Sequence, residues 1–153
     1  MKDYSYYPGC SAEASGKAYD ISARNVSRAL GVDLVELQDW NCCGATAYMS
    51  VREKRAMALS ARNLALAEEH GRDLVTICSG CFSVLSKTHQ YMAANQDLRR
   101  EVADALRAAD LEYRGTLRIR HLLDVLVNDV GESAIRERLK KELKGLRVAA
   151  YYG

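Results

Sequence analysis

The chain has 153 residues, of which 48% are apolar and 27% are charged, a length and balance typical of one globular domain with a buried core. Its formal net charge of +2 comes from 22 basic and 20 acidic residues without a basic run, which argues against a nucleic-acid partner. The sequence has no apolar stretch of the length that a signal peptide or a spanning helix needs, so we expect a cytoplasmic protein without direct membrane insertion.

The first part of the chain alternates predicted strands and helices. Residues 4–7 are predicted to form a short strand that ends at Pro8-Gly9, and residues 16–30 carry apolar side chains in a helical rhythm. Residues 33–37 form a second predicted strand, which is followed by a loop that contains residues 40–44.

The longest predicted helix covers residues 48–70, and Gly71 is its natural stop. A third strand at residues 73–78 and a helix at residues 81–95 follow. The remaining predicted elements are an extended piece at residues 117–120 and helices at residues 97–109, 121–128 and 132–144. This alternation predicts an α/β fold with a small, mostly parallel sheet flanked by helices.

The five cysteines are the main chemical feature of the sequence. Their number is odd, so they cannot all pair as disulfides within the chain, and a reducing compartment keeps them as thiols unless something binds them. All five lie in or beside the loops after the first three predicted strands, and such loops meet at one edge of a parallel sheet. We therefore expect convergence of Cys10, Cys42, Cys43, Cys78 and Cys81.

The segment Cys78-Ser79-Gly80-Cys81 places two thiolates within reach of one metal ion or one cluster edge. Gly80 permits a tight turn, and its amide can point at sulfur. Thioredoxin-like redox pairs and zinc sites use the same spacing, although a zinc ribbon needs a second such pair, which this chain lacks.

The adjacent pair Cys42-Cys43 is more informative. Neighbouring side chains diverge, so two adjacent thiolates fit one tetrahedral ion poorly but can hold two different irons of a polynuclear cluster. Gly44 leaves backbone room beside the metal and can supply an amide hydrogen bond to a sulfide.

Ligand counting leaves alternatives open, because a cubane cluster or a zinc ion needs four thiolates and leaves one of five over. The fifth thiol is then a resolving or nucleophilic thiol, a buried bystander, or a ligand of a cluster that uses all five. A zinc site, metal-free redox thiols and structural thiols are the alternatives to an iron–sulfur cluster.

Some other side chains could contribute to the site. His121 lies at a strand-to-helix junction, where it could donate a proton to a leaving thiolate or simply cap the helix. Tyr6, Tyr7 and Trp40 flank the cysteine loops, where they could shield the metal from water or belong to the ordinary core.

The cysteine arrangement, with 31 residues between Cys10 and Cys42 and 34 residues between Cys43 and Cys78, resembles the cysteine-rich CCG domain of the heterodisulfide reductase B subunit. The resemblance extends over almost the whole chain. It includes Tyr7-Pro8-Gly9-Cys10, Ala61-Arg62-Asn63-Leu64, Leu74-Val75-Thr76-Ile77-Cys78, Ile119-Arg120-His121-Leu122 and Asn128-Asp129-Val130-Gly131.

The resemblance implies a noncubane four-iron, four-sulfur (4Fe-4S) cluster that is held by all five cysteines. It further implies a second CCG domain in tandem, a small disulfide substrate between the two clusters, and reduction of that disulfide to two thiols. Electrons would arrive through a ferredoxin-like iron–sulfur subunit and, behind it, a flavoprotein subunit.

The end of the chain repeats part of its beginning, because residues 148–153 echo the aromatic pair and glycine of residues 4–9. We therefore expect a CCG iron–sulfur domain at residues 1–145 and the start of a second CCG repeat at residues 146–153. A disulfide reductase subunit cut at this point would be inactive without its second domain.

Two alternative functions follow from the same residues. One is an electron-transfer iron–sulfur module of a lactate- or glycolate-oxidising complex, and the other is a structural zinc-binding domain. Zinc could also replace the cluster in protein that is prepared in air.

Overall fold

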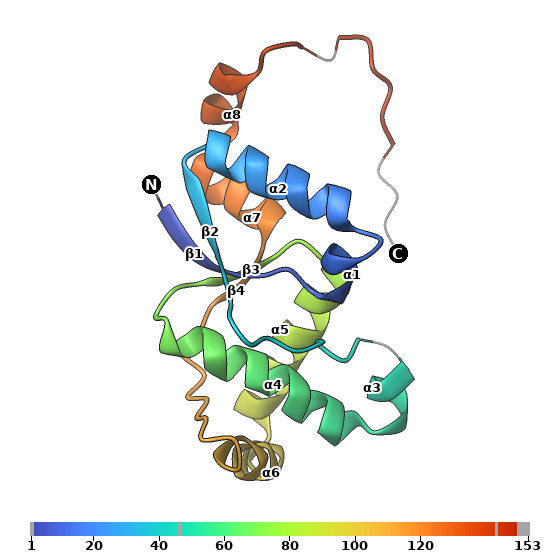
Figure 1. The fold of residues 1–153 in the computed structure, drawn as a ribbon, viewed down its shortest axis with the longest axis vertical. Coiled ribbons are helices and arrows are strands. Elements are labelled where there is room, and N and C mark those ends of the chain that lie inside the picture. The colour runs from blue at the N-terminus through green and yellow to red at the C-terminus, as the bar shows by residue number, and fades with distance from the viewer. Residues whose placement is uncertain (1, 46, 143, 150–153) are drawn as a thin grey trace.

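The computed structural model describes residues 2–45, 47–142 and 144–149 and contains one parallel sheet (Figure 1). Its strands have the order β2-β1-β3-β4, and every neighbouring pair is parallel. The strands are β1 (Lys2–Tyr7), β2 (Val32–Glu36), β3 (Leu74–Thr76) and β4 (Ile119–His121). The predicted α/β class with a parallel sheet is confirmed.

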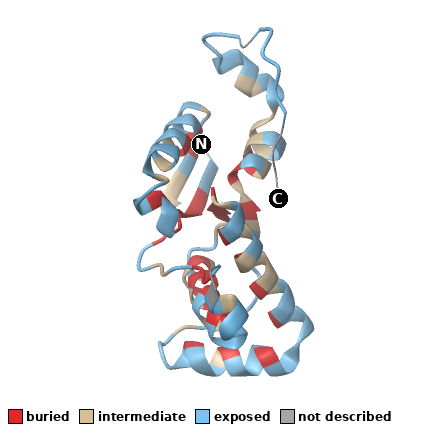
Figure 2. Ribbon diagram, turned by 90° about the vertical axis from the view of Figure 1, so that its right-hand side faces the viewer, coloured by how far each residue is buried: buried red, intermediate tan, exposed pale blue. Residues whose placement is uncertain are grey.

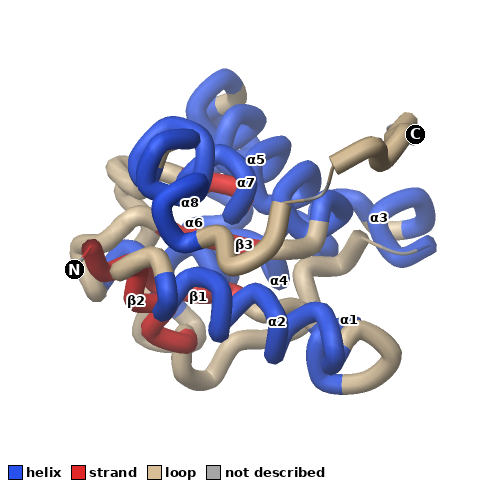
Figure 3. The backbone as a smooth tube through the Cα atoms, turned by 90° about the horizontal axis from the view of Figure 1, so that it is seen from above, coloured by secondary structure: helices blue, strands red, loops and turns tan. Residues whose placement is uncertain are grey.

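Helices enclose the sheet on both faces, as Figures 1 and 3 show. One face packs against α4 and α5, with α6 beyond them in the same core cluster, and the other face packs against α2 and α7. The helices are α1 (Cys10–Glu13), α2 (Lys17–Ala29), α3 (Ala47–Val51), α4 (Glu53–Glu69), α5 (Ser79–Ala94), α6 (Gln96–Arg107), α7 (Leu122–Val125), the π-helical turn η1 (Leu126–Val130) and α8 (Glu132–Arg138).

Strand β1 lies between β2 and β3 and is buried on both faces. Its side chains alternate, so Tyr4 and Tyr6 join the core on the α2 side, whereas Tyr7 joins the core on the α4–α5 side. Buried residues gather around the strands and α4, while the segment after α8 is exposed (Figure 2). The central strand thus connects the two halves of the core.

The predicted helix at residues 48–70 is wrong as one element, because it is divided into α3 and α4. Arg52 separates them with φ −144° and ψ 64°, outside the helical region. The buried face of α4 begins only at Ala56, and most described side chains before it are exposed. Core packing therefore fixes the direction of α4 but not that of the preceding turns.

The C-terminal elements also differ from the prediction. Helix α8 ends at Arg138 instead of residue 144, and the described side chains beyond it are all exposed, so no core stabilises a longer helix. The helix predicted at residues 121–128 becomes α7 followed by η1. The predicted start of a second repeat falls partly on residues 150–153, which lie outside the described residues.

In the described part of the chain, no helix combines the length and the apolar character that crossing a membrane requires.

A buried arginine ties η1 to the sheet. Arg120 of β4 is only 6% exposed, and its guanidinium donates two hydrogen bonds to Asp129, at 2.7 and 2.8 Å. Asp124 and Asp73 complete the ion-pair group, and the Tyr4 hydroxyl donates to Asp129. Arg120 and then Tyr4 hold the pKa of Asp129 well below its usual range.

We predict that Arg120→Leu lowers the free energy of unfolding at neutral pH by about 3 kcal/mol, because it removes the buried cation of Asp129 and leaves only the exposed Lys2 beside it. A carboxyl with a depressed folded-state pKa stabilises the fold above its unfolded pKa of about 3.9, and this contribution is lost as the pH falls towards the folded value. The difference between variant and parent should therefore shrink below about pH 4. Urea unfolding at several pH values measures it.

Arg136→Leu is the matched control, since the Arg136–Glu132 pair is exposed on α8 and should contribute nothing measurable. Equal losses in the two variants would contradict the assigned role of Arg120.

Candidate metal centre

Three loops that carry cysteines meet at the carboxyl edge of the sheet. The chain leaves β1 through α1 and α2 to reach β2 on one side, whereas β3 lies on the other side of β1. Ligands bind at such a point, because connections that leave in opposite directions open a crevice there. In Figures 1 and 3, α1 and α3 lie at the end of the molecule opposite the N-terminus.

The thiols form two close pairs and a fifth neighbour. The sulfurs of Cys10 and Cys42 are 4.0 Å apart, and those of Cys43 and Cys81 are 3.4 Å apart. The adjacent residues Cys42 and Cys43 therefore face different partners. Cys78, which caps α5, also interacts with Cys81 through its sulfur.

The two pairs differ in their exposure. Cys43 and Cys81 are buried, Cys10 and Cys42 are exposed, and Cys78 is intermediate. A groove of about 390 Å³ lies beside the exposed pair, between Glu13 and Trp40. The site thus has a closed inner side and an open outer side.

The thiols of the inner pair, Cys43 and Cys81, are close enough for one to donate a hydrogen bond to the other. The S–H of Cys81 stabilises the Cys43 thiolate and lowers the pKa of Cys43 to about 6, although burial acts in the opposite direction. The pKa of Cys81 rises because it keeps that proton beside the Cys43 thiolate, and its burial adds to the effect. Burial and the neighbouring Cys42 also raise the pKa of Cys10.

Gly9 is a residue that the sequence interpretation missed. Its φ is +79°, and a Cβ atom at this position would lie 2.9 Å from the Cys81 sulfur. Any other residue would therefore be strained and would push on a thiol. The tripeptide Pro8-Gly9-Cys10 at the end of a strand was the available signal.

The two predicted glycines play different parts. Gly44 has φ +82°, but a Cβ atom at this position would lie 3.5 Å from the Cβ atom of Ala56 in α4 and not beside a thiol. Gly80 lies in the first turn of α5, where a Cβ atom would be 3.7 Å from the Cys78 sulfur. Gly44 therefore serves the turn, whereas Gly80 lies beside the thiols.

Tyr7 forms the back wall of the site. Its ring is fully buried, contacts Trp40 edge-on at 5.3 Å between centroids, and lies in the same core cluster as Cys43 and Cys81. Burial and then the charges of the cysteines raise the pKa of Tyr7. Tyr6 lies on the other face of the sheet, where its hydroxyl donates to Asp20, so the structure does not support its predicted shielding role.

His121 has a capping role in the structure. Its Nδ1 accepts a hydrogen bond from the backbone N–H of Leu123 at 3.2 Å, so Nε2 carries the proton and donates to the Ile77 carbonyl at 3.1 Å. Both ring nitrogens are thus engaged with the backbone, and no catalytic role is assigned to His121.

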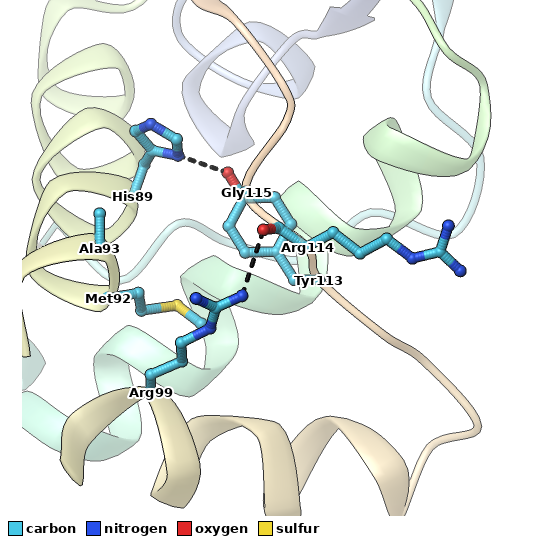
Figure 4. Close-up of a pocket in the computed structure, with 7 residues that line it drawn as sticks. All are labelled: His89, Met92, Ala93, Arg99, Tyr113, Arg114 and Gly115. Atoms are coloured by element: carbon cyan, nitrogen blue, oxygen red, sulfur yellow. Dashed lines mark hydrogen bonds between the residues drawn. The ribbon is translucent and has the colours of Figure 1, made fainter. Parts of the chain in front are cut away.

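A second cavity, of about 200 Å³, lies away from the thiols (Figure 4). His89 follows Cys81 by eight residues, which is roughly 12 Å along α5. Figure 4 shows the His89 ring bonded to the Tyr113 hydroxyl, Arg99 bonded to the Arg114 carbonyl, and the Arg114 side chain pointing away. The polar groups of this cavity therefore mainly form hydrogen bonds with one another.

The donor set fits a group that contains several soft metal atoms. Thiolates select zinc, copper(I) and iron–sulfur clusters. Among the described residues, no three His, Cys, Asp or Glu side chains form a group that could hold a metal ion. Two separate thiol pairs, with Cys78 three residues before Cys81, could instead hold different atoms of a polynuclear group.

We predict that one thiol of the reduced, metal-free chain titrates near pH 6, because Cys81 stabilises the Cys43 thiolate. Cys81→Ala removes the stabilising S–H, so the pKa of Cys43 should rise towards its ordinary value of about 8.5. The ultraviolet absorption of the thiolate measures this titration. Cys10→Ala is the control and should keep the step near pH 6; a parent chain without that step would contradict the assignment.

Comparison with known proteins agrees with this arrangement. The cysteine-rich domain family CCG matches residues 4–86. All of this chain is similar, at 34% identity, to 52% of a protein of Archaeoglobus profundus that is named as similar to the B subunit of heterodisulfide reductase. It is 30% identical to 52% of the 8-methylmenaquinol:fumarate reductase membrane anchor subunit of Wolinella succinogenes. It is 27% identical to 51% of the B subunit of the ferredoxin:CoB-CoM heterodisulfide reductase of Methanosarcina mazei.

The chain spans about half the length of the curated relatives that it matches. The match to the family model includes the three cysteine-bearing loops, from β1 to the first half of α5. The chain therefore belongs to the cysteine-rich CCG domain family.

Proposed function

We propose that this chain is an iron–sulfur electron-transfer domain of an oxidoreductase, with a polynuclear cluster held by Cys10, Cys42, Cys43, Cys78 and Cys81. The observation that carries the proposal is the meeting of the two thiol pairs and Cys78 at one sheet edge. When bound, the cluster supplies one-electron chemistry.

The residues around the cysteines give the site one buried side and one exposed side. Tyr7 and the surrounding core exclude water from Cys43 and Cys81, which lowers the local dielectric and would thereby influence the reduction potential of the cluster. Cys10 and Cys42 face the groove, where a substrate or a partner can approach. Gly80 leaves space beside the Cys78 sulfur, because a Cβ atom at this position would lie 3.7 Å from it.

The reaction that we propose is reduction of a small disulfide, in which two electrons and two protons break one S–S bond and form two thiols. Support comes from relatives whose names assign them to heterodisulfide reductases. The cluster would be of the noncubane 4Fe-4S type that the family resemblance implies, and the five free thiols that three loops bring to one edge of the sheet support this proposal.

The proposed complex contains further parts. A second CCG domain would begin at about residue 146 and would complete the substrate site, because relatives are about twice as long. A ferredoxin-like iron–sulfur subunit and a flavoprotein subunit would deliver electrons. Free thiols favour a reducing compartment, which supports a cytoplasmic location.

A second candidate is electron transfer without disulfide chemistry. The relative from Wolinella succinogenes is named as a subunit of an 8-methylmenaquinol:fumarate reductase. In that case the same cluster would pass electrons between partners, as in the expected lactate- or glycolate-oxidising module, and no thiol product would form.

We predict that the anaerobically reconstituted chain binds about four irons with equimolar acid-labile sulfide. Replacing any one of the five cysteines by alanine should lower the iron content and change the paramagnetic resonance spectrum, because each thiolate is a ligand. Iron, sulfide and zinc analysis of the parent and five single variants measures this.

Ser60→Ala is the control, because Ser60 is buried in α4 and makes no hydrogen bond through its hydroxyl. Stoichiometric zinc that persists after anaerobic reconstitution with iron would instead support the structural zinc domain. In the full-length protein, thiol formation from an added disulfide distinguishes disulfide reduction from simple electron transfer.

A further inference from the structure

A polar side chain lies fully buried in the middle of α4. Asn63 has 0% exposure, and most of the other buried residues of this helix are alanine, methionine or leucine. Burying an amide in an apolar environment is unfavourable unless its donor and acceptor are satisfied. The partners of Asn63 therefore indicate what this residue stabilises.

Asn63 binds the backbone of Asn41 in both directions. The Asn41 N–H donates to Oδ1 of Asn63 at 2.9 Å, and Nδ2 of Asn63 donates to the Asn41 carbonyl at 2.9 Å. The Tyr7 hydroxyl donates to the same carbonyl at 2.8 Å. The side-chain amide of Asn63 thus pairs with the N–H and the carbonyl of Asn41 as a neighbouring strand would, and it fixes a loop segment that has no such strand beside it.

Asn41 immediately precedes the Cys42-Cys43 pair. Its carbonyl belongs to the peptide plane that enters Cys42, so Asn63 and Tyr7 fix the orientation of that plane. The Asn41 side chain then donates to the Cys42 carbonyl at 2.9 Å and to the Leu59 carbonyl of α4 at 3.0 Å. Both peptide planes that flank Cys42 are therefore held.

The positions of the two thiols follow from these planes. With the backbone of Cys42 fixed on both sides, its sulfur points towards Cys10 and that of Cys43 towards Cys81. A rotation of the entering plane would redirect both neighbouring side chains together, because they diverge from one short segment.

We propose that Asn63, acting through Asn41, is a positioning residue that fixes the orientation in which Cys42 and Cys43 reach Cys10 and Cys81. Only the expected effect of Asn63 on cluster binding rests on the proposed function. The thiol geometry itself is a property of the metal-free chain and can be measured separately.

The first experiment measures thiol geometry in the reduced, metal-free protein. A monosubstituted trivalent arsenical bridges two thiols that lie close together, so its affinity for the Cys10–Cys42 pair reports their relative position. Proteolysis and mass spectrometry locate the bridge. We expect Asn63→Ala and Asn63→Asp to weaken bridging by about tenfold, because one removes the amide and the other places a carboxylate oxygen against the Asn41 carbonyl.

Two further variants separate positioning from folding. Ser60→Ala changes another fully buried polar residue of the same helix, one without a hydrogen-bond partner, and should leave bridging unchanged. Asn41→Ala keeps the backbone bonds to Asn63 but removes the side-chain bonds to Cys42, Leu59 and Arg62. It should weaken bridging through a change at a less buried position. If circular dichroism shows that the Asn63 variants do not fold, the Asn41→Ala variant alone tests the inference.

The second experiment follows the cluster. In reconstituted protein, Asn63→Asp should release iron to a chelator about tenfold faster and should change the paramagnetic resonance spectrum, as loss of an outer-shell hydrogen bond does at other metal sites. Unchanged bridging in every folded Asn63 and Asn41 variant would overturn the inference. A parent chain that binds no cluster, but whose bridging depends on Asn63, would overturn the proposed function and leave the inference standing.

Discussion

The site depends on one topological constraint, the placement of β1 between β2 and β3 in a parallel sheet. Because all three strands run in the same direction, their following loops reach the same edge. Because β2 and β3 lie on opposite sides of β1, the loops approach from different directions and can surround a group from several sides. The thiols of each pair, Cys10 with Cys42 and Cys43 with Cys81, accordingly come from different loops.

Tyr7 connects this edge to the core. Side-chain alternation along β1 places it on the α4–α5 face with Cys43 and Cys81, whereas Tyr6 packs towards α2. A one-residue register shift would exchange the two tyrosines and remove the back wall of the site. Two of the five thiols, Cys43 and Cys81, are themselves core residues. In the proposed function, folding and metal binding would therefore be coupled, because a loosened core would displace these ligands.

Local patterns predicted the features that depend on local sequence. The β-branched and aromatic runs identified the strands, and the position of the cysteines after these strands identified the edge at which they meet. The break at Arg52, the choice of Tyr7 instead of Tyr6 for the face with the thiols, and the partners of Asn63 could not be obtained in this way. Each is fixed by packing between segments far apart in the chain, and neither helical periodicity nor a motif encodes which backbone group a buried amide will meet.

The contrast between inner and outer thiols adds a functional argument. Cys43 and Cys81 are enclosed by core residues, whereas Cys10 and Cys42 are exposed, so this exposed pair forms the solvent-facing side of the site. Cys42 on this exposed side belongs to the Asn41-Cys42-Cys43 loop. Asn63 of α4 anchors this loop through two hydrogen bonds to the Asn41 backbone. Anchoring the loop from within the core leaves its outer surface, beside Trp40 and the groove, available for contact. In the proposed function, the anchored loop would keep the cysteine ligands fixed, while electrons and substrate would be exchanged on the exposed side of Cys10 and Cys42.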